Sequence, residues 1–186
     1  LWGERVALNF LQRMSGIATM TANMVASVKD LGVGIVDTRK TTPGLRLLEK
    51  YAVRQGGGVN HRMGLDDAVL IKDNHIAVAG GIKQAISMVR ANVSHMVKIE
   101  VETENEAEVR EALEAGADVI MLDNMSPDEM AKMVKLINKR AIVEASGNVK
   151  LDTVKAIAKT GVDVISVGAL THSVSSLDIS LDLFHR

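Results

Sequence analysis

The sequence predicts an α/β fold, an incomplete TIM-like barrel of about six parallel strands with helices outside it. Short apolar runs alternate with segments of helical spacing, an order typical of parallel βαβ units. One run places Lys98, Glu100 and Glu102 on a single face. A flat sheet between two helix layers would be apolar on both faces, so this alternation favours a barrel. Six runs are fewer than the eight strands of a complete barrel, so we expect an incomplete one.

The expected elements follow in order along the chain. A long helical segment at about residues 4–30 comes first and has no strand of its own. The strand-like runs are Val33–Val36, Ala68–Ile71, Val97–Val101, Val119–Leu122, Ala141–Glu144 and Val164–Val167. The clearest helices between them are Glu104–Ala115, Pro127–Asn138 and Lys150–Thr160, with Ser126 as an N-cap and Gly161 as a stop. We therefore divide the chain into a helical lead-in, residues 1–30, and an α/β barrel, residues 31–186.

Composition excludes several classes of protein. The 186 residues are 47% hydrophobic and 24% charged, which is ordinary for a soluble globular domain. A formal net charge of −1 gives no basic field for nucleic acid. Cysteine is absent, which excludes disulfides and thiolate metal sites and fits a cytoplasmic protein. No apolar run is long enough to span a membrane, and nothing at the start resembles a signal peptide. The chain begins without Met inside a helical segment, so we expect it to be part of a longer protein.

Positive charges gather where the first two strands should end. Arg39 and Lys40 follow the first strand, His61 and Arg62 lie in a glycine-rich loop, and Lys72 follows the second strand. The carboxyl ends of parallel strands share one mouth, so these side chains should share one pocket. Such a pocket suits a small molecule with several carboxylates or phosphates. For Arg39 and Lys40 taken by themselves, the alternative to ligand binding is surface ion pairing. For Lys72, the alternative to binding an anion is a role as a Schiff-base nucleophile.

Acidic residues stand at the ends of the next two strands. Glu102 and Asp123 suit a divalent cation or sugar hydroxyls. Glu100 lies deeper on the same face, and we expect it to pair with Lys98. No His and carboxylate cluster has the sequence spacing of a zinc site.

Two loops of small residues follow the last two strands. Ser146, Gly147 and Asn148 form the first, and Val167–Ala169 with His172 form the second. Backbone N–H groups at such turns bind anions, and barrel enzymes often bind a phosphate there. Either loop alone could be a simple turn, but together they predict a phosphate site.

These residues resemble the quinolinate phosphoribosyltransferase family, the carboxylating nicotinate-nucleotide pyrophosphorylases, along nearly the whole chain. The matching motifs, in order, are Glu4–Asn9, Ser15–Thr19, Asp37–Gly44, Asn60–Arg62, Ile71–His75, Glu100–Glu102, Leu122–Asn124, Ser146–Asn148 and Ser166–His172. The resemblance implies a six-stranded incomplete barrel. It also implies a reaction of quinolinate with phosphoribosyl pyrophosphate and Mg²⁺, giving nicotinate mononucleotide, pyrophosphate and CO₂ in de novo NAD biosynthesis.

The resemblance also implies roles for single residues. Lys72, Glu102 and Asp123 would be catalytic, and the two acids would hold the ribose hydroxyls and the metal. The quinolinate carboxylates and the pyrophosphate would be bound by Thr38, Arg39, Lys40, His61, Arg62 and Lys72. The 5′-phosphate would be cradled by Ser146, Gly147, Asn148, Val167, Gly168 and Ala169, with His172 close by.

The resemblance implies a homodimer or a larger assembly in which Arg5 reaches into the pocket of the neighbouring subunit. Members carry an N-terminal domain that covers the partner's barrel mouth, and no such domain precedes Leu1 in this sequence. Two alternatives stay open: a related phosphoribosyltransferase for another pyridine acid, and a non-catalytic phosphate-binding barrel fragment. Glu102 and Asp123 argue against the second, because plain anion binding has no use for acids there.

Overall fold

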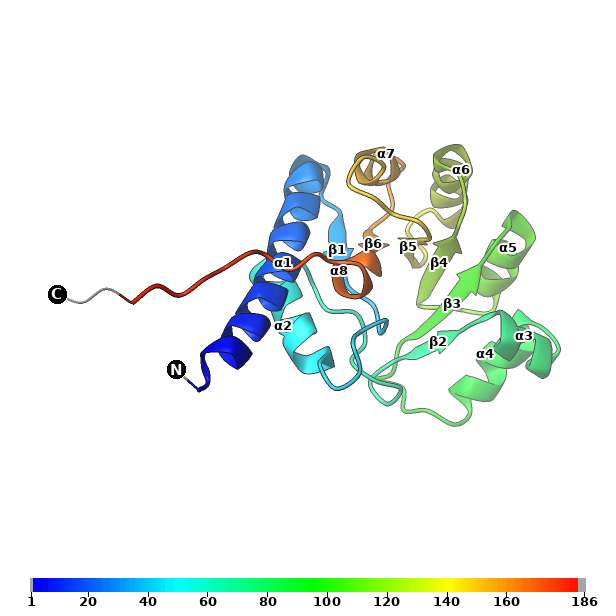
Figure 1. Ribbon diagram of the computed structural model, residues 1–186. Coiled ribbons are helices and arrows are strands. Elements are labelled where there is room, and N and C mark those ends of the chain that lie inside the picture. Colours follow the sequence, from blue (N-terminus) through cyan, green and yellow to red (C-terminus); the bar gives the residue numbers. More distant parts are fainter. Residues whose placement is uncertain (1, 184–186) are drawn as a thin grey trace.

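The computed structural model describes residues 2–183 and shows a curved, wholly parallel sheet with helices on its outer face (Figure 1). The strands are β1 (Gly34–Val36), β2 (Val69–Ile71), β3 (Ile99–Thr103), β4 (Val119–Asp123), β5 (Ile142–Ser146) and β6 (Val164–Ser166). Their order in the sheet is β1-β6-β5-β4-β3-β2. The end strands β1 and β2 are not paired with each other, so the barrel is incomplete, and the predicted fold class is confirmed.

All six predicted strands form, with shifted ends. β3 begins two residues later than expected, because a turn closed by the Val97 N–H on the Ser94 carbonyl precedes it (3.0 Å). It continues to Thr103, whose hydroxyl donates to the Met121 carbonyl of β4 (2.8 Å). β5 likewise extends to Ser146, through its register with Asp123.

The long first helix α1 (Glu4–Val28) continues into a short 3₁₀ turn, η1 (Lys29–Leu31), as the sequence predicted. The other helices are α2 (Arg46–Gln55), α3 (Asp73–Ala79), α4 (Ile82–Arg90), α5 (Glu106–Glu114), α6 (Pro127–Ile137), α7 (Val154–Ala158) and α8 (Ala169–His172). The N-cap Ser126 is confirmed: its hydroxyl accepts from the Glu129 N–H. α7 is shorter than predicted, because the Lys150 N–H donates to the Thr153 hydroxyl and closes a turn instead (3.0 Å).

The main core lies between the sheet and the helices. Outward-facing strand residues such as Val101, Ile120 and Leu122 are fully buried there. Met130 and Met133 of α6 help to fill this layer, in a chain whose aromatic content is only 2%. The alternate strand positions face the barrel interior, where the polar side chains gather.

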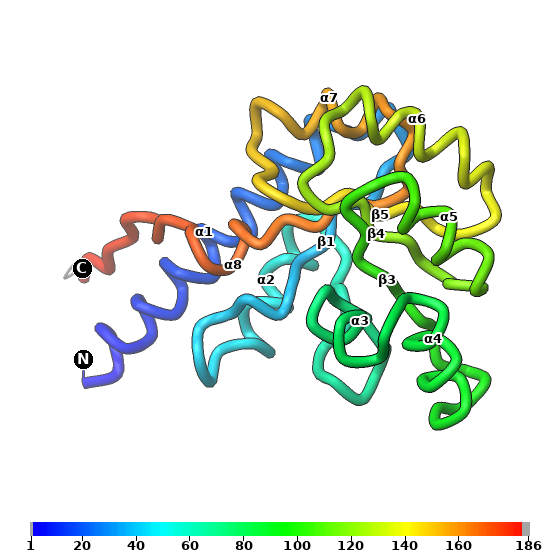
Figure 2. Tube along the Cα trace, turned by 90° about the vertical axis from the view of Figure 1, so that its right-hand side faces the viewer, coloured from blue at the N-terminus to red at the C-terminus, as the bar shows by residue number. Residues whose placement is uncertain are grey.

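The carboxyl-terminal segment crosses α1. The Leu177 N–H donates to the Gln12 carbonyl (3.1 Å), and the Gln12 amide donates to the Ile179 carbonyl (2.8 Å). A Cβ at Gly16 would lie 2.2 Å from the Ser175 carbonyl oxygen, so only glycine admits this close crossing. Both ends of the described chain therefore lie on the α1 side of the molecule (Figures 1 and 2).

Among residues 2–183, no helix combines the length and the apolar character that a membrane crossing requires.

Candidate active site

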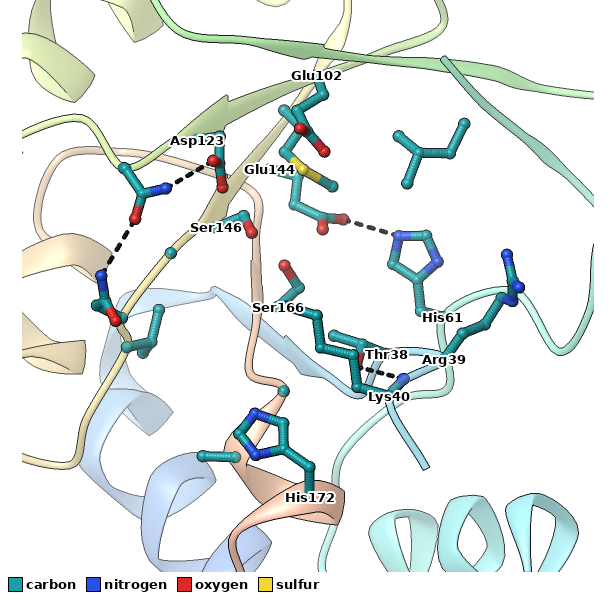
Figure 3. Close-up of a pocket in the computed structure, with 18 of the residues that line it drawn as sticks. Thr38, Arg39, Lys40, His61, Glu102, Asp123, Glu144, Ser146, Ser166 and His172 are labelled. Atoms are coloured by element: carbon teal, nitrogen blue, oxygen red, sulfur yellow. Dashed lines mark hydrogen bonds and ion pairs between the residues drawn. The ribbon is translucent and has the colours of Figure 1, made fainter. Parts of the chain in front are cut away.

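A cavity of about 810 Å³ opens at the carboxyl ends of the strands (Figure 3). Most of the predicted site residues line it together: Thr38, Arg39, Lys40, His61, Arg62, Lys72, Glu102, Asp123, Ser146, Gly147, Asn148, Gly168, Ala169 and His172. Residues from all six strand ends thus meet in one pocket, as the parallel topology requires.

Two predicted residues are not part of this lining. Arg5 is exposed in the first turn of α1, outside the cavity of its own chain. Val167 is buried in the core, and its N–H donates to the Val36 carbonyl (2.9 Å). The Val167 N–H is therefore engaged by β1 rather than directed at a ligand.

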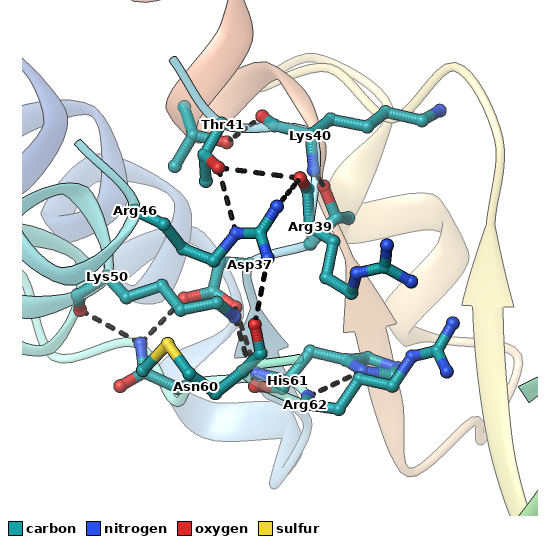
Figure 4. Close-up of polar contacts among 12 residues, drawn as sticks. Asp37, Arg39, Lys40, Thr41, Arg46, Lys50, Asn60, His61 and Arg62 are labelled. Carbon is teal, nitrogen blue, oxygen red and sulfur yellow. Dashed lines mark hydrogen bonds and ion pairs between the residues drawn. The ribbon is translucent and has the colours of Figure 1, made fainter. Parts of the chain in front are cut away.

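Arg39 and Lys40 are held by main-chain contacts behind the pocket (Figure 4). The Arg46 guanidinium donates to the Arg39 carbonyl (3.2 Å) and to the Thr41 hydroxyl (3.1 Å). The Thr171 hydroxyl donates to the Lys40 carbonyl (2.7 Å). Within residues 2–183, the buried Nε of Arg39 has no hydrogen-bond partner. A buried donor without a partner costs free energy, so this guanidinium is poised for an acceptor that enters the pocket.

A buried ion pair between Arg13 and Glu49 holds the loop that carries Arg39 and Lys40. Glu49 is fully buried, and its carboxylate accepts from the Arg13 guanidinium of α1 (2.8 Å) and from the Thr42 N–H (3.0 Å). Arg13 also donates to the Thr171 carbonyl (2.5 Å). These bonds join α1, α2 and α8 under the cationic loop.

A second buried network fixes the loop that carries His61. Lys50 of α2 is fully buried and pairs with Asp37 at the end of β1 (Figure 4). The Lys50 ammonium also donates to the His61 carbonyl (3.0 Å), and the His61 N–H donates to Asp37 (2.9 Å). Asn60 adds a bond to the second Asp37 oxygen (2.6 Å). The loop is therefore tied to β1 even though β1 and β2 are not paired.

His61 lies between two buried acids. Its Nε2 is 3.1 Å from Glu100 Oε2 and 3.4 Å from Glu144 Oε2. Figure 3 shows the contact with Glu144. The expected pairing of Glu100 with Lys98 is wrong, because Glu100 points into the barrel whereas Lys98 is exposed just before β3. The atoms of His61, Glu100 and Glu144 form a compact cluster that sequence spacing did not reveal, since the residues come from three separate segments.

This cluster holds protons strongly. Burial lowers the pKa of His61, but the hydrogen bonds and charges of Glu100 and Glu144 outweigh it and raise that pKa from 6.5 to about 10. Burial also raises the pKa of Glu100. The Arg62 N–H donates to His61 Nδ1 (2.8 Å), so the ring carries its proton on Nε2, facing the two carboxyl groups. The raised pKa then describes uptake of a further proton by the three side chains as one coupled group.

Arg62 and Arg39 form a cationic wall. Burial lowers the pKa of the Arg62 guanidinium, and the positive charge of Arg39 lowers it further. The Arg62 guanidinium donates to the Ala68 carbonyl (3.3 Å). Two adjacent guanidinium groups in a partly buried wall favour a ligand with more than one negative charge.

Of the three predicted catalytic residues, Lys72 and Glu102 are in direct contact, and Asp123 contacts Asn124. The Lys72 ammonium lies 2.5 Å from Glu102 Oε2, and Glu102 is the more buried of the two. Asp123 accepts from the Asn124 amide (2.6 Å). His75 caps α3: its Nδ1 accepts from the Lys72 N–H (3.0 Å).

The donor chemistry of Glu102 and Asp123 fits a hard divalent cation. Both are carboxylates, both line the pocket, and they end the neighbouring strands β3 and β4. Mg²⁺ prefers such oxygen ligands, usually few from the protein and the rest from water and phosphate.

The loop after β5 has a backbone that only glycine readily adopts. Gly147 has φ +101°, and a Cβ there would lie 2.2 Å from Asn124 Oδ1. Asn124 itself takes a positive φ and accepts from the Asn148 amide (3.3 Å). Asn124 thus connects Asp123 to the predicted phosphate loop.

We expect Gly147→Ala to lower the affinity for ribose 5-phosphate by about 10-fold or more, because the loop must move away from Asn124. Calorimetric titration measures this. Gly116→Ala is the matched control, since Gly116 also has a positive φ (+79°) but open space around its Cβ position. Equal losses in both variants would show that backbone strain alone is responsible.

Sequence reasoning missed several residues of the site. Pocket-lining residues outside the predicted set include Glu144, Asn124, Lys150, Ser166, Met121 and Leu70. Strand alternation was the available signal for Glu144, which lies two positions before Ser146 on the inward face. The supporting pairs around Lys50 and Glu49 gave no such signal, because charges on an amphipathic helix are usually solvated.

A family model described as the quinolinate phosphoribosyl transferase C-terminal domain matches residues 17–182. The probable carboxylating nicotinate-nucleotide pyrophosphorylase of Bacillus subtilis is 57% identical over 183 residues, covering 98% of this chain and 63% of that protein. The protein of the same description from Methanocaldococcus jannaschii is 53% identical and covers 97% of this chain and 66% of its own length.

Solved structures agree. The nicotinate-nucleotide pyrophosphorylase from Ehrlichia chaffeensis superposes with a TM-score of 0.94 at 48% identity, covering 97% of this chain and 65% of that one. NadC from Streptococcus pyogenes gives a TM-score of 0.90 at 50% identity, covering 94% and 61%. This chain therefore spans somewhat less than two thirds of the length of each of these relatives.

Proposed function

Because the chain belongs to the quinolinate phosphoribosyltransferase family through its C-terminal domain, we propose that it forms the barrel of an enzyme transferring phosphoribosyl to quinolinate with decarboxylation. The products would be nicotinate mononucleotide, pyrophosphate and CO₂, a step of NAD biosynthesis. The observation that carries the proposal is the paired guanidinium wall of Arg39 and Arg62, with the buried Arg39 Nε lacking a partner among the described residues. Quinolinate offers two adjacent carboxylates to such a wall.

The proposed chemistry needs positioning and charge, and no nucleophilic side chain. The pyridine nitrogen attacks C1 of the ribose while pyrophosphate leaves, through an oxocarbenium-like state. Glu102 and Asp123 stabilise the positive charge on the sugar, and Lys40 and Lys72 offset the charge of the departing pyrophosphate. Bonding to ribose makes the nitrogen cationic, and this charge stabilises the electron pair left on the adjacent ring carbon when its carboxylate leaves as CO₂. A proton from solvent then takes the place of the carboxylate on that carbon.

Mg²⁺ is part of this proposal. Glu102 and Asp123 would hold it, directly or through water, and when bound it would neutralise charge on the pyrophosphate. The phosphate at the 5′ position would sit on the loops of Gly147 and Gly168. Holding two polyanionic substrates together could supply several kcal/mol of barrier reduction.

The assembly is also proposed. Arg5, which lies outside the cavity of its own chain, is exposed and free to enter a neighbour's pocket in a dimer. We place the enzyme in the cytoplasm, with no nucleic acid or membrane partner. The prediction is a dimer that loses quinolinate affinity when Arg5 is replaced.

The test is product identification with the natural full-length protein. Quinolinate, phosphoribosyl pyrophosphate and Mg²⁺ should give nicotinate mononucleotide, and a chelator should stop its formation. Nicotinate or another pyridine monoacid serves as the alternative acceptor. Turnover of a monoacid with none of quinolinate would replace this proposal by that of a related phosphoribosyltransferase.

A further inference from the structure

His61 has partners on both ring nitrogens. Nδ1 accepts the Arg62 N–H at 2.8 Å, and Nε2 faces Glu100 at 3.1 Å and Glu144 at 3.4 Å. A ring protonated at Nε2 satisfies all three contacts. Neither nitrogen is then free for a substrate carboxylate, so the ring links protein groups to one another.

The place of this link in the barrel is informative. His61 lies on the segment between β1 and β2, the two strands that do not pair. One side of this segment is held by the bridge of Val59 to Val36 and by the Asp37 network. The other side reaches the barrel wall through His61, because Glu100 belongs to β3 and Glu144 to β5. Figure 3 shows His61 and Glu144 pointing toward each other across the pocket floor.

Burying Glu100 and Glu144 without a partner would destabilise the fold. Their side chains are only 9% and 4% exposed, and each keeps a buried Oε1 that has no partner among the described residues. Two carboxyl groups buried side by side need a compensating partner, and the His61 ring is that partner. Buried acids of this kind concentrate at functional sites.

We propose that Glu100 and Glu144 are positioning residues that act through His61: they fix the ring, and the ring fixes the backbone of Arg62, so that its guanidinium stays in the wall beside Arg39. The inference rests on the proposed function for its kinetic test. It assigns to Glu100 and Glu144 an effect on the acid substrate and not on phosphoribosyl pyrophosphate.

The kinetic test compares Glu100→Gln and Glu144→Gln in the natural full-length protein, alone and in a His61→Ala background. Each single variant should raise KM for quinolinate about 10-fold and change KM for phosphoribosyl pyrophosphate by less than about two-fold. In the His61→Ala background, neither should add more than about two-fold, because both act through the same ring. Glu114→Gln, an exposed acid at the end of α5, is the control for charge removal.

The outcomes separate the two proposals. If wild-type protein forms no product from quinolinate, the proposed function fails. If it does, but the glutamate variants act equally without His61 or raise both KM values together, the positioning role fails. Ring ¹⁵N chemical shifts of His61 in the wild-type protein test its contacts with Arg62 and the two glutamates directly, without measuring turnover and without the glutamate variants. They should place the His61 proton on Nε2 with Nδ1 as acceptor. A freely tautomerising ring, or a ring protonated on both nitrogens, would overturn the inference.

Discussion

Lys50→Met should lower the free energy of unfolding by about 3–5 kcal/mol, the largest stability effect that we expect from one substitution in this chain. Lys50 and Asp37 have side chains 1% and 0% exposed, and removing the cation leaves the carboxylate buried without its charge partner. The His61 carbonyl would lose a donor as well. Urea unfolding of wild type and variant measures the difference.

Lys135→Met on the exposed face of α6 is the matched control and should change stability by less than about 0.5 kcal/mol. The double variant Asp37→Asn with Lys50→Met should lose less than the single Lys50 variant, because the unpaired charge is then gone. A Lys50→Met protein as stable as the control would mean that Asp37 does not depend on the Lys50 charge, contrary to the buried network described above.

Arg39→Ala should lower kcat/KM for quinolinate by about 100-fold, or ~2.7 kcal/mol of transition-state binding. The Arg39 guanidinium is anchored through its own backbone by Arg46, and its buried Nε lacks a partner within residues 2–183. Replacing Arg39 removes a charge-assisted hydrogen-bond donor from the partly buried cationic wall, where such bonds are strong. Initial rates at varied quinolinate, with phosphoribosyl pyrophosphate saturating, measure the effect.

Arg39→Lys should recover only part of the loss, because a lysine cannot bind a carboxylate through two parallel N–H groups. Arg54→Ala, an exposed arginine in the last turn of α2, should be neutral. If Arg39→Ala retained full activity, the guanidinium wall would not be the acid-binding site.

The fold and most of the pocket were predictable from the sequence because both follow short-range patterns. Alternating strands and helices give a parallel sheet, and a parallel sheet brings residues such as Arg39, Asp123 and Gly168 to one edge. The contacts that hold the pocket depend on long-range packing. Glu100 could face Lys98 or a distant histidine with the same alternation, and only the position of the His61 loop decides between them.

The burial of two charged residues and the ends of several elements could not be predicted from local sequence patterns. Lys50 and Glu49 sit on one turn of α2, where charged side chains usually meet water, yet both are buried by α1, β1 and the loops around them. Element ends shifted by up to four residues, the largest shift being the start of α7, where the Lys150 N–H donates to the Thr153 hydroxyl and delays the helix. The role of Arg5 depends on a second copy of the chain and stays a prediction.

The most direct test of the central proposal is release of CO₂ from carboxyl-labelled quinolinate by the natural full-length protein with Mg²⁺, with and without phosphoribosyl pyrophosphate. We predict release that depends strictly on phosphoribosyl pyrophosphate, since the electron pair left on the ring carbon is stabilised only after the ring nitrogen is bonded to ribose. No release in its presence, from protein shown to be folded, would contradict the assignment of this barrel to decarboxylating phosphoribosyl transfer.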